Sequence, residues 1–131
     1  MKSSVLPTET TMSLLIVDDN VHFVNRVTKL VQDIPHIGPI HIANTFDEAN
    51  EMLNKEKPDL VLLDISLQGK NGIGILEGIV QSGKACKVIM VTNNTDEYYR
   101  QKCIDLGALY FLDKTYDFAR IPEIISRLKS A

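Results

Sequence analysis

Asp64 follows directly on an uninterrupted apolar run in this sequence. Residues 60–63 read Leu-Val-Leu-Leu, with Pro58 shortly before them and Gly69 and Gly72 beyond the acid. A short apolar run with such boundaries is typical of a strand buried on both faces of a sheet. In an open parallel α/β sheet, ligands bind at the carboxyl ends of the strands. Asp64 is therefore the first candidate for a reactive residue.

Other apolar runs end in polar residues in the same way. These residues are Asp18 and Asp19 after residues 13–17, Thr92 after residues 88–91 and Lys114 shortly after residues 109–112. If the strands are parallel, their ends meet at one edge of the sheet, and we expect these side chains to lie close together.

Three neighbouring carboxylates repel one another, so the cluster needs a cation. It offers oxygen ligands without His or Cys, which suits a hard cation, and Mg²⁺ fits best. Mg²⁺ is commonly shared between carboxylates and phosphate oxygens. The hydroxyl of Thr92 and the ammonium of Lys114 could both contact the oxygens of a phosphoryl group. Their presence therefore favours a site that receives such a group. Asp64 would then be the nucleophile that forms an aspartyl phosphate.

Taken singly, each of these residues has an ordinary structural explanation. Asp64 could cap the turn that follows it, and the Asp18-Asp19 pair could supply the N-cap of the next helix. Asp19 could be that cap while Asp18 binds the metal, or both could help to bind it. A lone Thr92 is usually structural, and a lone Lys114 is usually a solvated surface residue. Their occurrence together at successive strand ends favours a site.

Five apolar runs predict five strands, and helical patterns follow each of them. The strands are expected at residues 13–17, 39–43, 60–63, 88–91 and 109–112. A capping box at Thr45 and Glu48 starts one helix, Gly107 ends another, and residues 68–72 have the composition of a loop. Strands that alternate with helices imply right-handed βαβ crossovers. The fold class is therefore α/β, a three-layer sandwich with a five-stranded parallel sheet flanked by five helices.

Length and composition set the broad class. The 131 residues suit one domain, with residues 1–12 as a flexible N-terminal leader. The net charge of −3 argues against a nucleic-acid partner. No apolar run approaches the roughly 18 residues of a membrane span, and the N-terminal residues include no apolar stretch of the kind that a secretory signal has, so we expect neither. Cys86 and Cys103 lack metal-ligand spacing. A disulfide between them is the alternative to what we expect, which is two small core residues in a reducing, cytoplasmic compartment.

Several of these motifs together resemble the receiver domain of two-component response regulators. They are Val17-Asp18-Asp19, Leu62-Leu63-Asp64-Ile65 with Gly72 beyond it, Val91-Thr92, and Gly107-Ala108 leading through Phe111 to Lys114. The resemblance extends from residue 13 to residue 131. It implies a flavodoxin-like fold with strand order 2-1-3-4-5.

The resemblance also implies roles for these residues. Asp64 would accept a phosphoryl group from a histidine kinase, with Thr92 and Lys114 contacting that group. Mg²⁺ would be held by Asp18, Asp19, Asp64 and the backbone carbonyl of Ser66. Thr92 and Phe111 would form the switch, with Thr92 turning inward and Phe111 following into the vacated space.

Three positions depart from the pattern of this family. Gln68 stands where many receivers have proline, so the loop after Asp64 is expected to be looser. Asn93 is larger than the small residue usual after the switch threonine, and it could screen the site. Thr115 replaces a proline that is often cis, so no cis peptide bond is expected there.

We therefore expect a signalling switch whose partners are a histidine kinase or phosphotransfer protein and a downstream protein. The downstream protein would bind the face formed by helix 4, strand 5 and helix 5. The chain ends about one helix after Lys114, which suggests a stand-alone receiver. We expect it to catalyse only its own phosphorylation and dephosphorylation. We also expect a monomer or a weak phosphorylation-dependent dimer. The alternatives are a small-molecule phosphohydrolase that forms an aspartyl phosphate and an adaptor of receiver shape that is never phosphorylated.

Overall fold

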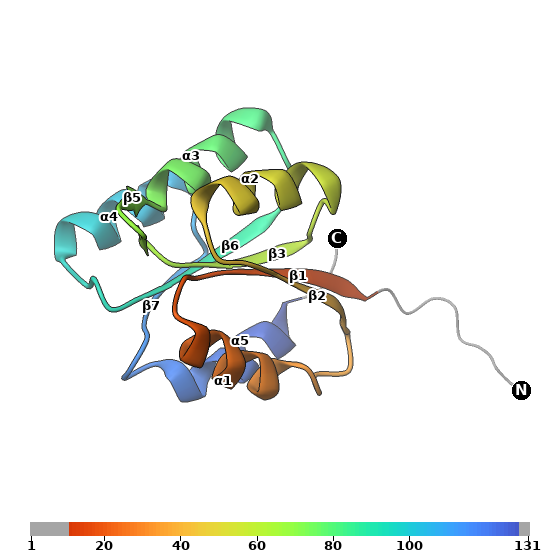
Figure 1. Cartoon of the computed structure of the whole chain (residues 1–131). Helices are drawn as coiled ribbons and strands as arrows, with labels where there is room; N and C mark the ends of the chain where they lie inside the picture. Colours follow the sequence, from red (N-terminus) through yellow and green to blue (C-terminus); the bar gives the residue numbers. More distant parts are fainter. Residues whose placement is uncertain (1–10, 129–131) are drawn as a thin grey trace, which may run out of the picture.

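Five parallel strands form the central sheet in the order β2-β1-β3-β6-β7, and the computed structural model describes residues 11–128 (Figure 1). The strands are β1 (Met12–Val17), β2 (Ile37–Ala43), β3 (Leu60–Leu63), β6 (Lys87–Thr92) and β7 (Tyr110–Asp113). Two short extra strands take the labels β4 and β5, so this is the expected order 2-1-3-4-5. The predicted fold class is confirmed.

Helices cover both faces of the sheet and complete three layers. On one face lie α1 (Val21–Val31) and α5 (Ile121–Arg127), and on the other lie α2 (Phe46–Lys55), α3 (Ile73–Ser82) and α4 (Glu97–Leu106) (Figure 1). A 3-10 turn over Phe118–Arg120 precedes α5. Pro122 therefore stands in the first turn of α5, where its missing N–H leaves no helical hydrogen bond unmade.

Apolar side chains on alternate strand positions supply both halves of the core. In β1, Leu15 and Val17 pack with α2, α3 and α4, whereas Leu14 and Ile16 pack with α1 and α5. All four are fully buried. A strand covered on both faces must be apolar throughout, which explains its uninterrupted run.

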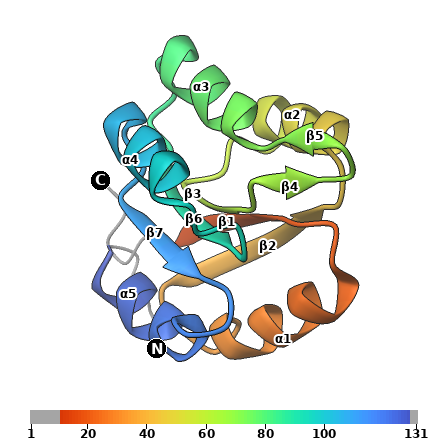
Figure 2. The ribbon, with the colours of Figure 1, turned by 90° about the vertical axis from the view of Figure 1, so that its left-hand side faces the viewer.

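A short antiparallel hairpin occupies part of the segment that was expected to be a loop. Ser66–Leu67 forms β4 and Lys70–Asn71 forms β5, with Leu67 opposite Lys70 (Figure 2). The two residues between them, Gln68 and Gly69, have φ values of +46° and +84°. Positive φ at both central residues is typical of the type I′ turn, which matches the twist of a two-residue hairpin. The prediction of a loop over residues 68–72 was wrong for Lys70 and Asn71, which form β5, whereas Gln68 and Gly69 do form a turn.

The helix ends agree with the predicted caps at two of three places. The hydroxyl of Thr45 accepts the Glu48 N–H at 3.1 Å at the start of α2, and Gly107 ends α4 with φ +113°. At α1, however, the N-cap is Asn20, whose side chain accepts the Phe23 N–H at 3.0 Å. The expectation that Asp18 or Asp19 caps this helix was wrong.

The chain before β1 was expected to be a flexible leader over residues 1–12. Residues 1–10 lie outside the described part of the chain, and β1 begins at Met12, which is fully buried.

Both cysteines are free thiols, Cys103 buried and Cys86 partly exposed. Within residues 11–128, the helices are all too short or too polar to cross a membrane.

Candidate functional site

The polar side chains that are buried in the described part of the chain coincide with predicted site residues. They are Asp18, Asp64, Thr92 and Lys114. All four lie at or just after the carboxyl ends of β1, β3, β6 and β7. Buried polar groups are costly unless they are paired, so their collection at one end of the sheet indicates a built site.

Backbone hydrogen bonds between neighbouring strands bring these residues together. The Asp18 N–H donates to the Ala43 carbonyl at 3.1 Å, and the Asp64 N–H donates to the Val17 carbonyl at 3.1 Å. The Lys114 N–H donates to the Thr92 carbonyl at 3.0 Å. The sheet hydrogen bonding thus continues one residue beyond the strands and fixes where each side chain begins.

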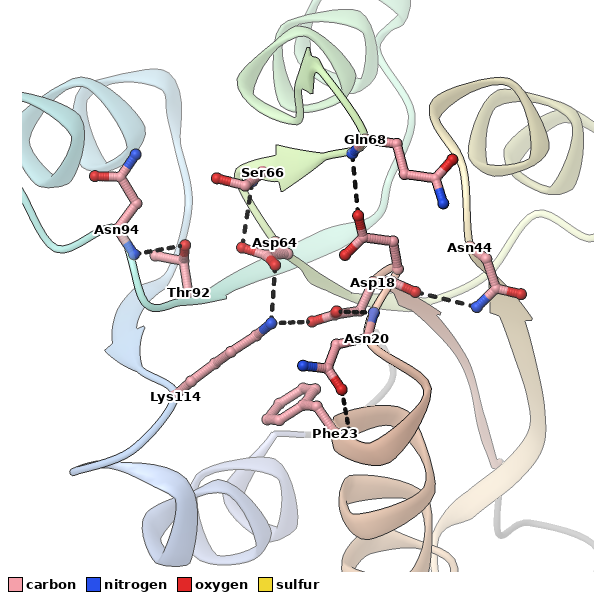
Figure 3. Close-up of polar contacts among 11 residues, drawn as sticks. Asp18, Asn20, Phe23, Asn44, Asp64, Ser66, Gln68, Thr92, Asn94 and Lys114 are labelled. Carbon is pink, nitrogen blue, oxygen red and sulfur yellow. Dashed lines mark hydrogen bonds and ion pairs between the residues drawn. The ribbon is translucent and has the colours of Figure 1, made fainter.

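The ammonium group of Lys114 joins the two buried carboxylates (Figure 3). Its Nζ lies 2.8 Å from Oδ2 of Asp18 and 2.9 Å from Oδ2 of Asp64. Burial disfavours the ammonium, but its contacts with Asp18 and Asp64 outweigh this and raise the pKa of Lys114 above its ordinary value. Lys114 is therefore the fixed positive charge of the site.

Asp18 is held at both its side chain and its backbone. Its Oδ1 accepts the Asn20 N–H at 2.8 Å, and its carbonyl accepts the Asn44 side-chain amide at 3.1 Å (Figure 3). Burial raises the pKa of the Asp18 carboxyl, and the contact with Lys114 offsets part of that rise. These contacts hold the Asp18 side chain in one orientation beside Lys114.

Asp19 lies at the more exposed rim of the same cluster. Its Oδ2 accepts the backbone N–H of Gln68 in the hairpin turn at 3.0 Å. Asp64 has a weaker contact of this kind, since its Oδ1 accepts the Ser66 N–H at 3.4 Å. Both carboxylates are therefore connected to the segment that follows β3.

The three carboxylates fit the Mg²⁺ that receiver domains bind through acidic residues. Asp18, Asp19 and Asp64 each offer an oxygen, and these oxygens lie within 4.8 Å of one another. Three carboxylates and the single Lys114 ammonium leave a formal charge of −2 at the site, which a divalent cation would neutralise. Oxygen donors without nitrogen or sulfur match the preference of this ion.

Thr92 and Phe111, the predicted switch pair, occupy neighbouring strands. The Thr92 hydroxyl oxygen accepts the Asn94 N–H at 3.0 Å, which leaves its O–H free to donate (Figure 3). Phe111 is buried in the core that β6 and β7 share with α2, α3 and α4. Asn93, the residue whose size could screen the site, is exposed.

Arg100 in α4 contacts Phe111 and was not anticipated from the sequence. Its guanidinium donates to the Phe111 carbonyl at 3.2 Å and lies 4.9 Å from the centre of the Phe111 ring.

Asn20 and Asn44, which support Asp18, were also missed as site residues. Asn20 had a readable signal, because Asn is a strong N-cap residue directly before a helical pattern.

Comparison with known proteins places this geometry in a family. The response regulator receiver domain model matches residues 14–126. Protein CcdB of Bacillus subtilis (strain 168) is 30% identical over 115 residues, which is 88% of this chain and 95% of that protein. A protein-glutamate methylesterase/protein-glutamine glutaminase of Idiomarina loihiensis is 34% identical over 113 residues, 84% of this chain. The chain spans only 29% of that methylesterase.

Solved structures of receiver domains have the same fold and support the same family. The signal receiver domain of a DNA binding response regulator protein (merR) from Colwellia psychrerythraea 34H has a TM-score of 0.81 at 26% identity, covering 88% of this chain and 96% of that one. The response regulator domain of Thermotoga maritima CheB has a TM-score of 0.77 at 26% identity, covering 89% and 92%. The chain therefore belongs to the response regulator receiver domain family of two-component signalling.

Proposed function

We propose that this chain is a phosphorylation-controlled switch that accepts a phosphoryl group on Asp64. The observation that carries the proposal is the ammonium of Lys114, held 2.9 Å from Asp64 and 2.8 Å from Asp18 at the end of a buried sheet. The Asp64 carboxylate therefore has the fixed positive charge of Lys114 beside it. That charge would stabilise a phosphoryl group during and after transfer.

The donor would be the phosphohistidine of a histidine kinase or phosphotransfer protein. An Asp64 carboxylate oxygen attacks phosphorus, the phosphorus–nitrogen bond breaks, and the imidazole leaves with the electron pair and takes up a proton. The product is an acyl phosphate on Asp64. Asp18, Asp19, Asp64 and the Ser66 carbonyl would hold Mg²⁺, which would supply positive charge for the phosphoryl oxygens. Lys114 and the free Thr92 O–H would contact the remaining oxygens.

The signal would pass from Thr92 to the surface through Phe111. Thr92 and Phe111 lie on adjacent strands, and the Arg100 guanidinium ties Phe111 to α4. A Thr92 hydroxyl that turns toward a phosphoryl group would leave Asn94 and the loop before α4. Phosphorylation would thereby shift a two-state equilibrium of that loop, α4 and the Phe111 side chain.

The face formed by α4, β7 and α5 is the proposed contact for the downstream protein. Exposed large side chains occur on α4 and along the approach to and exit from β7. They are Tyr98, Ile104, Leu109, Tyr110 and Tyr116. Exposed aromatic residues of this kind are enriched in protein interfaces. The domain would act in the cytoplasm as a monomer or weak phosphorylation-dependent dimer, and it would catalyse only its own phosphorylation and dephosphorylation.

Intact-mass spectrometry after incubation with acetyl phosphate tests this proposal. The wild type should gain the mass of one phosphoryl group when Mg²⁺ is present and should gain none after chelation. Asp64→Asn should stay unmodified, while Asp105→Asn, at an exposed position of α4, should behave as the wild type. Modification of Asp64→Asn to the same extent as the wild type would contradict the proposal.

A further inference from the structure

The hairpin turn after β3 places a backbone donor against the acidic cluster. The Gln68 N–H donates to Oδ2 of Asp19 at 3.0 Å, although the two residues are 49 positions apart in the sequence. The contact is made by the backbone, and the exposed Gln68 side chain takes no part in it. The turn is anchored by the antiparallel pairing of Leu67 with Lys70.

Gln68 adopts a backbone conformation that is unfavourable for its type. Its φ of +46° lies in the left-handed region, which is strained for a non-glycine residue because Cβ crowds the following carbonyl oxygen. At the first central position of a two-residue hairpin, the N–H would otherwise point to water. The carboxylate of Asp19 accepts it instead, as a charge-assisted hydrogen bond. The turn and the Asp19 side chain therefore constrain each other.

We propose that the Gln68 backbone N–H is a positioning group that orients Asp19 for binding the divalent cation. This inference rests on the proposed function, because it assigns Asp19 to the Mg²⁺ site. With Oδ2 of Asp19 held by the turn, its other oxygen keeps one orientation beside Asp18 and Asp64. Asp19 is the most exposed of the three carboxylates, so it has the most rotational freedom to lose.

Hydrogen bonds that orient a metal-binding side chain commonly change metal affinity by 10- to 100-fold when they are removed. Gln68→Pro removes the N–H and cannot adopt φ +46°. We expect it to weaken Mg²⁺ binding roughly tenfold. Gln68→Gly is the matched control, because it keeps the N–H and adopts the left-handed conformation without strain. It should bind Mg²⁺ at least as tightly as the wild type.

A double-mutant cycle separates this positioning role from a general effect of the turn. Mg²⁺ affinity is measured by isothermal titration calorimetry for the wild type, Gln68→Pro, Asp19→Ala and the double variant, with urea unfolding to verify that each is folded. If Gln68 acts through Asp19, the loss caused by proline disappears in the Asp19→Ala background. Amide hydrogen exchange at Gln68 should also be slow in the wild type and fast in Asp19→Ala.

The outcomes are distinct. A roughly tenfold loss in the wild-type background alone supports the inference. An equal loss in both backgrounds, or no loss in either, overturns it while leaving the proposed function intact. A wild-type protein that binds no Mg²⁺ contradicts the metal-dependent function itself and overturns this inference with it.

Discussion

Gly72 and Asp64 lie so close together that a Cβ atom on Gly72 would overlap the backbone carbonyl oxygen of Asp64. The φ and ψ of Gly72, −62° and −16°, are helical values that any residue adopts. Glycine is therefore required for space and not for backbone freedom. The start of α3 packs directly against the backbone of the proposed phosphoacceptor.

Gly72→Ala should lower the free energy of unfolding by about 2 kcal/mol, because the new methyl group forces the backbone of Asp64 to move. It should also slow phosphorylation by acetyl phosphate. Urea unfolding and intact-mass time courses measure the two effects. Gly78→Ala is the control, since its added Cβ meets open space in the middle of α3 and should raise stability by up to about 1 kcal/mol. A Gly72→Ala variant as stable as the wild type would refute this explanation.

Lys114→Met should destabilise the protein by about 3 kcal/mol in the absence of divalent ions. The substitution leaves Asp18 and Asp64 buried without their shared cation, and unpaired buried charges are costly. Added Mg²⁺ should then raise the unfolding midpoint more in this variant than in the wild type, because it replaces part of the lost positive charge. Lys102→Met, on α4, is the control. An unchanged midpoint for Lys114→Met without Mg²⁺ would argue against the central role of this ion pair.

Asn20→Ala should cost about 1 kcal/mol of stability, because it removes the N-cap of α1. Asn20→Ser keeps a side-chain oxygen and should stay within a few tenths of a kcal/mol of the wild type. The backbone N–H that Asp18 accepts is present in both variants, so Mg²⁺ affinity should change little. Chemical denaturation of the three proteins tests this, and equal stability of the alanine and serine variants would contradict the capping role.

Stability should depend on pH through Asp117. Its carboxylate accepts the Asp113 N–H and pairs with Arg120, and the Asp113 hydrogen bond is the main reason that the pKa of Asp117 lies below 3.8. A lowered pKa in the folded state stabilises the protein above pH 3.8, and this contribution is lost as the pH falls through the folded-state value. The stability difference between the wild type and Asp117→Asn should therefore shrink below pH 3.8. A constant difference from neutral pH downward would refute this linkage.

The sequence predicted those parts of the molecule that follow from strongly apolar strands. Because β1, β3 and β6 are buried on both faces, their runs are unmistakable, and their ends located Asp18, Asp64 and Thr92. The hairpin of β4 and β5 was missed because two-residue strands are too short to show an alternating pattern. The α1 cap was misplaced because Asp18, Asp19 and Asn20 are all good N-caps, and only the fold selects among them.

Long-range contacts lay outside what local patterns specify. Arg100 on α4 donates to the Phe111 carbonyl on β7, 11 positions along the chain, and the Gln68 backbone N–H donates to Asp19, 49 positions away. Neither pairing leaves a periodic signal. From the sequence, Gly72 served only as a boundary of the apolar run, as part of a loop and as part of a family pattern. Its contact with Asp64 gives the physical reason for glycine there.

The most direct test of the central claim is chemical trapping of the phosphoryl group. The protein is phosphorylated with acetyl phosphate and Mg²⁺, then treated with sodium borohydride, which reduces an aspartyl phosphate to homoserine. Peptide mass spectrometry then locates the homoserine. We predict homoserine at position 64 in the wild type, and none there when Mg²⁺ is chelated. Homoserine at another aspartate, such as Asp18 or Asp19, would contradict Asp64 as the phosphoacceptor.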